Sequence, residues 1–146
     1  MIRPAAGADI PELALLWNRY RAEAGDDRWT DDEQWRGWML RRIAAGDVRI
    51  GIVERRMHAY VAWQRIRDAT SGTRTLVIRE LYVHPEGRGQ RLGSGLLARA
   101  IDAARQRDCD TVELVGNIHD EGARALVGPF GFDLTGDALR LQLQQR

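Results

Sequence analysis

The sequence predicts a mixed α/β (α+β) fold in a single domain. Its length of 146 residues suits one domain with a well-buried core. Segments whose apolar residues follow helical spacing are interspersed with short β-rich runs, which is typical of mixed folds. No internal repeat, low-complexity stretch or linker interrupts the chain, so we expect one domain over residues 1–146.

The composition indicates an ordinary globular protein. Hydrophobic residues make up 44% and charged residues 29% of the chain, and the net charge is +1. That balance gives no reason to predict a nucleic-acid or membrane surface. No run approaches the ~20 apolar residues of a membrane span, and residues 1–10 lack the apolar core of a signal peptide. With Cys109 as the single cysteine, no internal disulfide can form and a cytoplasmic location is expected.

Two helices are predicted ahead of the first β-rich run. Asp9 is the expected N-cap of the first helix, with Glu12 three residues later as in a capping box. This helix should end before Gly25. Thr30 is the expected cap of the second helix, which should stop at Gly46. The apolar stripe of the first helix consists of Ile10, Leu13, Leu16, Trp17 and Tyr20.

The remaining elements alternate between strands and helices. Residues 48–54 and 58–66 are predicted strands joined by a turn at Arg55-Arg56, and residues 74–83 form the longest β-rich run. A helix should follow up to about Gln106. The shorter expected elements are a strand at 2–4, a strand at 111–115, a helix at 122–127, and strands at 132–134 and 139–143.

The clearest functional signal lies in residues 88–95, Arg-Gly-Gln-Arg-Leu-Gly-Ser-Gly, which follow a strand and open a helix. Amides at a helix N-terminus have no intrahelical partner and lie at the positive end of the helix dipole, so they can bind phosphate. Glycines let the backbone approach a ligand closely. Arg88 and Arg91 add positive charge, and the pattern therefore suits a pyrophosphate ligand.

Three phosphate-binding motifs can be compared with this segment. A P-loop requires a Gly-Lys pair, which the sequence lacks. The dinucleotide fingerprint Gly-x-Gly-x-x-Gly fails because Gly89 and Gly93 are one residue too far apart. The third motif, Gln/Arg-x-x-Gly-x-Gly/Ala, is satisfied in full by Gln90, Gly93 and Gly95.

On these residues the chain resembles the GCN5-related N-acetyltransferase (GNAT) superfamily. Residues 80–97 are similar to the core motif of that family, and the resemblance extends to residues 120–126 and to Gly131-Phe132. It implies a mostly antiparallel sheet flanked by helices, with splayed central strands. It also implies an acetyl-CoA-dependent N-acetyltransferase, in which an amine attacks the thioester directly in a ternary complex.

The resemblance further implies where acetyl-CoA would bind. The backbone of Leu81 and Val83 should line the pantetheine arm and the thioester, and the amides of residues 90–95 should hold the pyrophosphate. The alternative is a glycine-rich loop that only turns the chain. The cofactor-binding residues expected in full are Leu81, Val83, Arg88, Gly89, Gln90, Arg91, Leu92, Gly93, Ser94 and Gly95.

Attack on a thioester needs a neutral amine, so some group must take its proton. The resemblance makes Glu80 the predicted general base, because it lies on the strand next to the expected thioester position, where many relatives carry an acidic residue. The alternative is a strand carboxylate paired with an arginine such as Arg79 or Arg65. The tyrosine that often serves as the acid in this family falls on Val127, which cannot donate a proton. No general acid is therefore assigned, and a non-catalytic acyl-CoA-binding module stays open as the alternative function.

The predicted acceptor is a primary amine of a small molecule or peptide. Carboxylates and aromatic faces, which together suit a cationic amine, gather between the first two predicted helices. Alternatively, the acids favour a helix N-terminus and the tryptophans are core. These residues are Asp26, Asp27, Trp29, Asp31, Asp32, Glu33 and Trp35.

Tyr82 and His119 are weaker candidates for acceptor contacts, with a core tyrosine and a solvated loop histidine as the alternatives. No cluster of residues has metal-ligand spacing, so no metal site is expected. Because relatives often dimerise, a homodimer is included among the expectations, whereas nucleic-acid and membrane partners are not.

Overall fold

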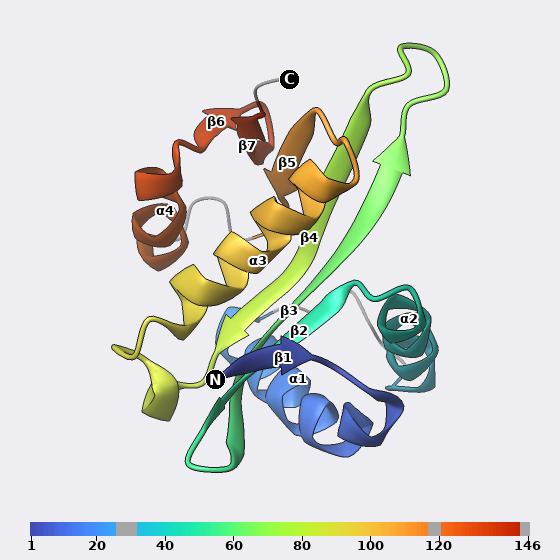
Figure 1. Cartoon of the computed structure of the whole chain (residues 1–146). Helices are drawn as coiled ribbons and strands as arrows, with labels where there is room; N and C mark the ends of the chain where they lie inside the picture. Colours follow the sequence, from blue (N-terminus) through green and yellow to red (C-terminus); the bar gives the residue numbers. More distant parts are fainter. Residues whose placement is uncertain (26–31, 117–120, 144–146) are drawn as a thin grey trace.

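The computed structural model describes residues 1–25, 32–116 and 121–143. Within them, a seven-stranded sheet has the order β1-β2-β3-β4-β5-β7-β6, and all neighbouring strands run antiparallel except β4 and β5, which run parallel (Figure 1). The strands are β1 (Ile2–Pro4), β2 (Val48–Val53), β3 (Arg56–Arg67), β4 (Arg74–Val83), β5 (Thr111–Leu114), β6 (Asp133–Thr135) and β7 (Ala138–Gln142). The helices are η1 (Gly7–Asp9), α1 (Ile10–Ala24), α2 (Asp32–Ala44), η2 (Pro85–Gly87), α3 (Leu92–Gln106), α4 (Glu121–Val127) and η3 (Gly128–Phe130).

The helices bury two separate apolar clusters against opposite faces of the sheet (Figure 1). Alternation along β3 shows the division, because Ala59 and Val61 pack in the cluster under α3, whereas Tyr60 and Ala62 pack in the cluster under α1 and α2. We call these the α3 face and the α1/α2 face. Helix α3 crosses over between the two parallel strands, β4 and β5, as a parallel connection requires.

A β-bulge in β4 changes which residues point to each face. Ala62 pairs with Glu80 but Trp63 pairs with Ile78, so Arg79 is the extra residue on β4. Before the bulge Ile78 packs on the α3 face, and after it Leu81 packs against the same cluster. Glu80 is therefore turned toward the α1/α2 face.

The two central strands separate just beyond the bulge. The register between β4 and β5 runs from Thr75–Thr111 to Ile78–Leu114 and ends there. One further hydrogen bond, from Val115 N to Ile78 O at 3.3 Å, closes the paired region. The predicted mixed α/β fold with splayed central strands is confirmed.

One turn was predicted in the wrong place. The turn between β2 and β3 is formed by Glu54 and Arg55, which both have positive φ (50° and 67°), one residue earlier than predicted. Such two-residue turns usually carry Asn or Gly, and neither signal is present here.

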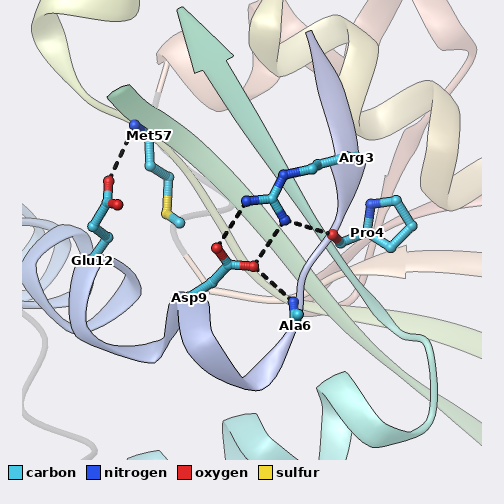
Figure 2. Close-up of polar contacts among 6 residues, drawn as sticks. All are labelled: Arg3, Pro4, Ala6, Asp9, Glu12 and Met57. Atoms are coloured by element: carbon cyan, nitrogen blue, oxygen red, sulfur yellow. Dashed lines mark hydrogen bonds and ion pairs between the residues drawn. The ribbon is translucent and has the colours of Figure 1, made fainter. Parts of the chain in front are cut away.

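Asp9 is the N-cap residue of α1 as predicted, but its side chain makes no capping hydrogen bond to that helix (Figure 2). Its carboxylate accepts from Ala6 N at 2.7 Å and forms two 2.9 Å hydrogen bonds with the guanidinium of Arg3, which ties β1 to the start of α1. Glu12 likewise does not close a capping box, because its Oε2 accepts from Met57 N at 3.4 Å.

Other boundaries agree with the predictions. Helix α1 ends at Ala24 and is followed by its C-cap, Gly25, in a left-handed conformation with φ 62°, and α3 ends at Gln106. The predicted cap Thr30 lies outside the described residues.

In the described part of the chain, no helix is long and apolar enough to cross a membrane, and no group of three or more His, Cys, Asp or Glu could hold a metal ion.

Candidate active site

A cavity of about 700 Å³ opens where β4 and β5 separate. One wall is the end of β4, residues 81–83, and the opposite wall is residues 114–116 at the end of β5. Helix α4 contributes Gly122, Ala123 and Leu126, helix α1 contributes Tyr20 and Glu23, and Arg88 stands at the loop that leaves β4. The cavity therefore exists because β4 and β5 stop pairing after Ile78 and Leu114. Continued pairing between the two strands would leave no such space.

Two histidines contact the loop from β4 to α3, and two residues of the loop have left-handed backbone conformations. His84 Nδ1 accepts from Glu86 N at 3.0 Å, which stabilises the short turn η2. Gly87 packs so closely on His58 that an added Cβ would lie 2.8 Å from His58 Cβ. Gly89 and Arg91 then have φ values of 84° and 60°, and only the first is a glycine.

Helix α3 presents its N-terminus directly after this loop. Gly95 N donates to the carbonyl of the N-cap residue, Arg91 O, at 3.0 Å and closes the first turn of the helix. The amides of Leu92, Gly93 and Ser94 precede Gly95 and have no carbonyl one turn earlier in the helix to bond to. These amides therefore have the arrangement that suits an anion.

The glycines of the motif also serve packing. A Cβ on Gly93 would lie 3.3 Å from Leu126 Cδ1 and 3.5 Å from Val83 Cγ2, so this glycine lets α3 approach α4 and β4. A Cβ on Gly95 would lie 2.5 Å from Ile2 Cδ1, so the absence of a side chain at Gly95 lets Ile2 of β1 pack against α3. The Gly95 amide already donates within the helix, and the side chain of Leu92 is buried in the α3-face cluster.

Glu80 is almost fully buried, with 3% of the residue exposed. Its carboxylate accepts from Tyr60 Oη at 2.6 Å and from Trp35 Nε1 at 3.2 Å. Burial, followed by the charge of Glu80, raises the pKa of Tyr60 well above its ordinary value, so this phenol stays a hydrogen-bond donor. Arg65, one of the arginines considered as a partner of Glu80, pairs with Asp47 at 3.5 Å.

A second polar group lines the cavity itself. Tyr82 Oη donates to Glu23 Oε1 at 2.9 Å, and Arg88 pairs with Glu23 Oε2 at 3.1 Å. The ring of Tyr82 stacks on that of Tyr20, with centroids 5.6 Å apart. Burial, and then the hydrogen bond to Glu23, raise the pKa of Tyr82 to about 12.

Sequence reasoning missed Glu23 and Tyr20. They stand three residues apart on one side of α1, which is a general helical pattern and not a site signal. The partner that distinguishes Glu23 from other surface glutamates is Arg88, which is 65 residues away in the sequence. Only the folded chain brings these residues together.

The predicted acidic and aromatic cluster is only partly described. Trp35 is fully buried and stacks on Trp17 with centroids 4.5 Å apart, which supports its alternative role as a core residue. Asp32 and Glu33 occupy the first turn of α2, and Val127 is buried in the α3-face cluster. Asp26, Asp27, Trp29, Asp31 and His119 lie outside the described residues.

Comparisons with known proteins agree with this geometry. The profile of the Acetyltransferase (GNAT) family matches residues 10–132. The chain belongs to this family. The predicted enzyme class of the GNAT chain, an acetyl-CoA-dependent N-acetyltransferase, is thereby confirmed, and membership favours it over the non-catalytic binding module. The individual site residues stay predictions.

Three relatives of this GNAT chain illustrate the likeness. The L-amino acid N-acyltransferase MnaT of Escherichia coli K12 is 31% identical over 129 residues, which cover 86% of this chain and 73% of that protein. The structure of yncA from Salmonella typhimurium with acetyl-CoA has a TM-score of 0.84 at 22% identity, covering 100% and 95% of the two chains. Arabidopsis thaliana Naa50 with the bisubstrate analogue CoA-Ac-MVNAL has a TM-score of 0.76 at 18% identity, covering 98% of each chain. At these identities the two structures show the fold alone.

Proposed function

We propose that this chain transfers the acetyl group of acetyl-CoA to the primary amine of an amino acid or of a peptide N-terminus. The observation that carries the proposal is the junction between the cavity and the N-terminus of α3, because Arg88 belongs to the loop and also lines the cavity. Two relatives support the acceptor class: one is named for L-amino acids and the other was solved with a peptide-containing analogue.

Acetyl-CoA would supply the activated thioester, and the chain would supply position and charge. We assign the pyrophosphate to the amides of residues 90–94, with positive charge from Arg88 and Arg91. The conformation of Gly89 lets the loop turn toward the helix. Leu92 and Gly95 would act through helix packing, since the Leu92 side chain is buried and the Gly95 amide is used within the helix.

The backbone of Leu81 and Val83 is assigned to the pantetheine arm. Both residues line the cavity where β4 has left β5, so their peptide groups are the ones no longer engaged by that neighbour. Backbone groups beside the thioester would also polarise its carbonyl, the usual means of stabilising charge that develops in acyl transfer.

Glu80 is proposed as the group that finally receives the amine proton. It lies on the same side of β4 as Tyr82, which lines the cavity, but its carboxylate is buried behind Tyr60 and Trp35. A proton would therefore reach it through a relay of hydroxyl groups or water and not by direct contact with the acceptor. Val127 is buried and offers no acid, so the leaving thiolate would be protonated by solvent.

The first test is ligand-dependent melting followed by turnover. Acetyl-CoA at 100 times its dissociation constant should raise the melting temperature by about 5–10 °C, while NAD and ATP should not. Thiol release should then appear with amino acids or short peptides. Absence of the acetyl-CoA shift would contradict the function, and a shift without thiol release from any amine would favour the binding module.

Ser94→Glu tests the pyrophosphate site with little risk to folding. A carboxylate in the first turn of a helix favours the helix dipole, so the free protein should stay as stable as the wild type. Beside a pyrophosphate the same charge is repulsive and should weaken acetyl-CoA affinity at least about tenfold. Ser71→Glu, in the exposed turn between β3 and β4, is the matched control. Equal affinities for the two variants would contradict the assignment.

A cytoplasmic location and a homodimer stay predictions. Sedimentation of the purified chain would test the dimer directly.

A further inference from the structure

The side chain of Arg88 bridges the cofactor loop and helix α1. Its Nε donates to Val83 O at 3.2 Å, and its Nη2 donates to Glu23 Oε2 at 3.1 Å. The Arg88 and Glu23 side chains are 56% and 40% exposed, so solvent reaches the pair and can replace either partner. Arg88 thus contacts both a β4 carbonyl assigned to the pantetheine arm and a carboxylate of α1 that lines the cavity.

Glu23 has the surroundings of a cation-binding carboxylate. Among the described residues that line the cavity, it is the only acidic one and Arg88 is the only basic one. Tyr82 holds Glu23 Oε1 with a hydroxyl that stays protonated at neutral pH. The other oxygen, Oε2, is bonded to the guanidinium of a residue on a different element, so this position already accepts a cation.

Resting on the proposed function, we infer that Glu23 binds the ammonium group of the acceptor in place of Arg88, which leaves Glu23 when acetyl-CoA enters. A guanidinium forms stronger, paired hydrogen bonds with phosphate oxygens than with one exposed carboxylate oxygen. Once Arg88 turns to the cofactor, the Glu23 carboxylate keeps the Tyr82 hydroxyl but has no other basic residue among the described residues that line the cavity. A cationic amine then satisfies it.

The inference concerns recognition and not the proton transfer that follows. Glu23 would select acceptors that are cationic at neutral pH over uncharged nucleophiles of similar size. It would also connect the two ligands, because acetyl-CoA frees the site that the amine requires. Each consequence has its own measurement.

Glu23→Gln removes the charge and keeps both the size of the side chain and an oxygen for Tyr82. With an alkylamine acceptor, which is an ammonium at pH 7, KM should rise at least about tenfold, as expected for loss of a charged hydrogen bond, while kcat changes less. With an arylamine, which is neutral at pH 7, KM should not change. Glu12→Gln on the same helix is the control, because Glu12 contacts Met57 N and does not line the cavity.

Acetyl-CoA affinity provides the second measurement. Glu23→Gln should bind acetyl-CoA about two- to fivefold more tightly, because Arg88 no longer has to leave an ion pair. In an Arg88→Gln background the same substitution should give no gain, since the pair is already absent. Calorimetric titration of the four proteins gives this cycle directly.

The outcomes separate the inference from the function on which it rests. Failure of the wild type to bind acetyl-CoA would overturn both. Normal wild-type turnover together with an unchanged alkylamine KM in Glu23→Gln would overturn the inference alone. An equal rise in KM for the alkylamine and the arylamine would also overturn it, because a distorted cavity does not discriminate by charge.

Discussion

The two faces of the sheet bury different kinds of side chain. The α3 face is lined by apolar side chains from β3, β4, β5 and α3, and its largest member is Trp63. The α1/α2 face is rich in aromatic rings and also buries the carboxylate of Glu80 against Tyr60 and Trp35. The α3 face stabilises the fold mainly by apolar packing, whereas the α1/α2 face also contains a buried carboxylate, which costs free energy to remove from water.

Strand β4 contributes residues to both faces of the sheet. On β4, Ile78 lies on the α3 face just before the bulge, and Glu80 lies on the other face just after it. The bulge inserts one residue, Arg79, so that after it Leu81 and Val83 pack on the α3 face, whereas Glu80 and Tyr82 point to the α1/α2 face. Substitutions at positions 78 and 80 can therefore test whether packing and chemistry are separable.

Ile78→Ala should have the largest effect on stability. The side chain is fully buried, and deletion of three carbons leaves a cavity between β4 and α3, so the free energy of unfolding should fall by about 2–5 kcal/mol. Urea denaturation measures the loss. At a temperature where the variant is still folded, kcat per folded molecule should match the wild type; a large fall in kcat would show that the α3 face also takes part in the chemistry.

Glu80→Gln should reverse this pattern. If Glu80 receives the proton, kcat should fall about a hundredfold or more and the acidic limb of the pH–rate profile should disappear, while acetyl-CoA affinity is unchanged. Stability should change less than in Ile78→Ala, because an amide oxygen can still accept from Trp35 or Tyr60.

The opposite result at Glu80 is equally informative. A lower melting temperature with an unchanged pH–rate profile would make Glu80 a buried acceptor that orients Tyr60 and Trp35. Tyr60→Phe is the matched control for that role, since it removes one donor to the carboxylate and retains the ring.

The features that could be predicted from the sequence are those marked by local patterns of residue type and spacing. The strand at 74–83, the glycine-containing loop and the helix ending at Gln106 carry local signals of residue type and spacing, and all three were predicted close to their observed bounds. The position of the bulge depends on the register with β3, and the cavity depends on where pairing with β5 ends. Neither is encoded within β4 itself.

The candidate site shows the same limit. Glu80 was singled out from its place on the strand, but its burial against Trp35 depends on a helix 45 residues earlier. Glu23 was not singled out, because its meeting with Arg88 spans 65 residues and no local pattern marks it. The turn at Glu54-Arg55 was misplaced for a different reason, since its residues are not the ones that positive φ angles usually select.

Arg91, in the loop between β4 and α3, offers the test with the smallest expected effect. It has φ 60° and ψ 22° at the start of α3, a conformation that costs a residue with a Cβ about 1 kcal/mol. Arg91→Gly and Arg91→Ala both remove the charge and differ only in the Cβ. The glycine variant should therefore be more stable than the alanine variant by a few tenths to about 1 kcal/mol, after the greater freedom of glycine in the unfolded chain offsets part of the gain.

If Arg91 contributes charge to the pyrophosphate site, both variants should lose the same few-fold in acetyl-CoA affinity, about two- to fivefold for a partly exposed charge. Equal stabilities would contradict the left-handed conformation, whereas unequal affinities would mean that the shape of the loop, and not the charge of Arg91, controls the binding of the cofactor.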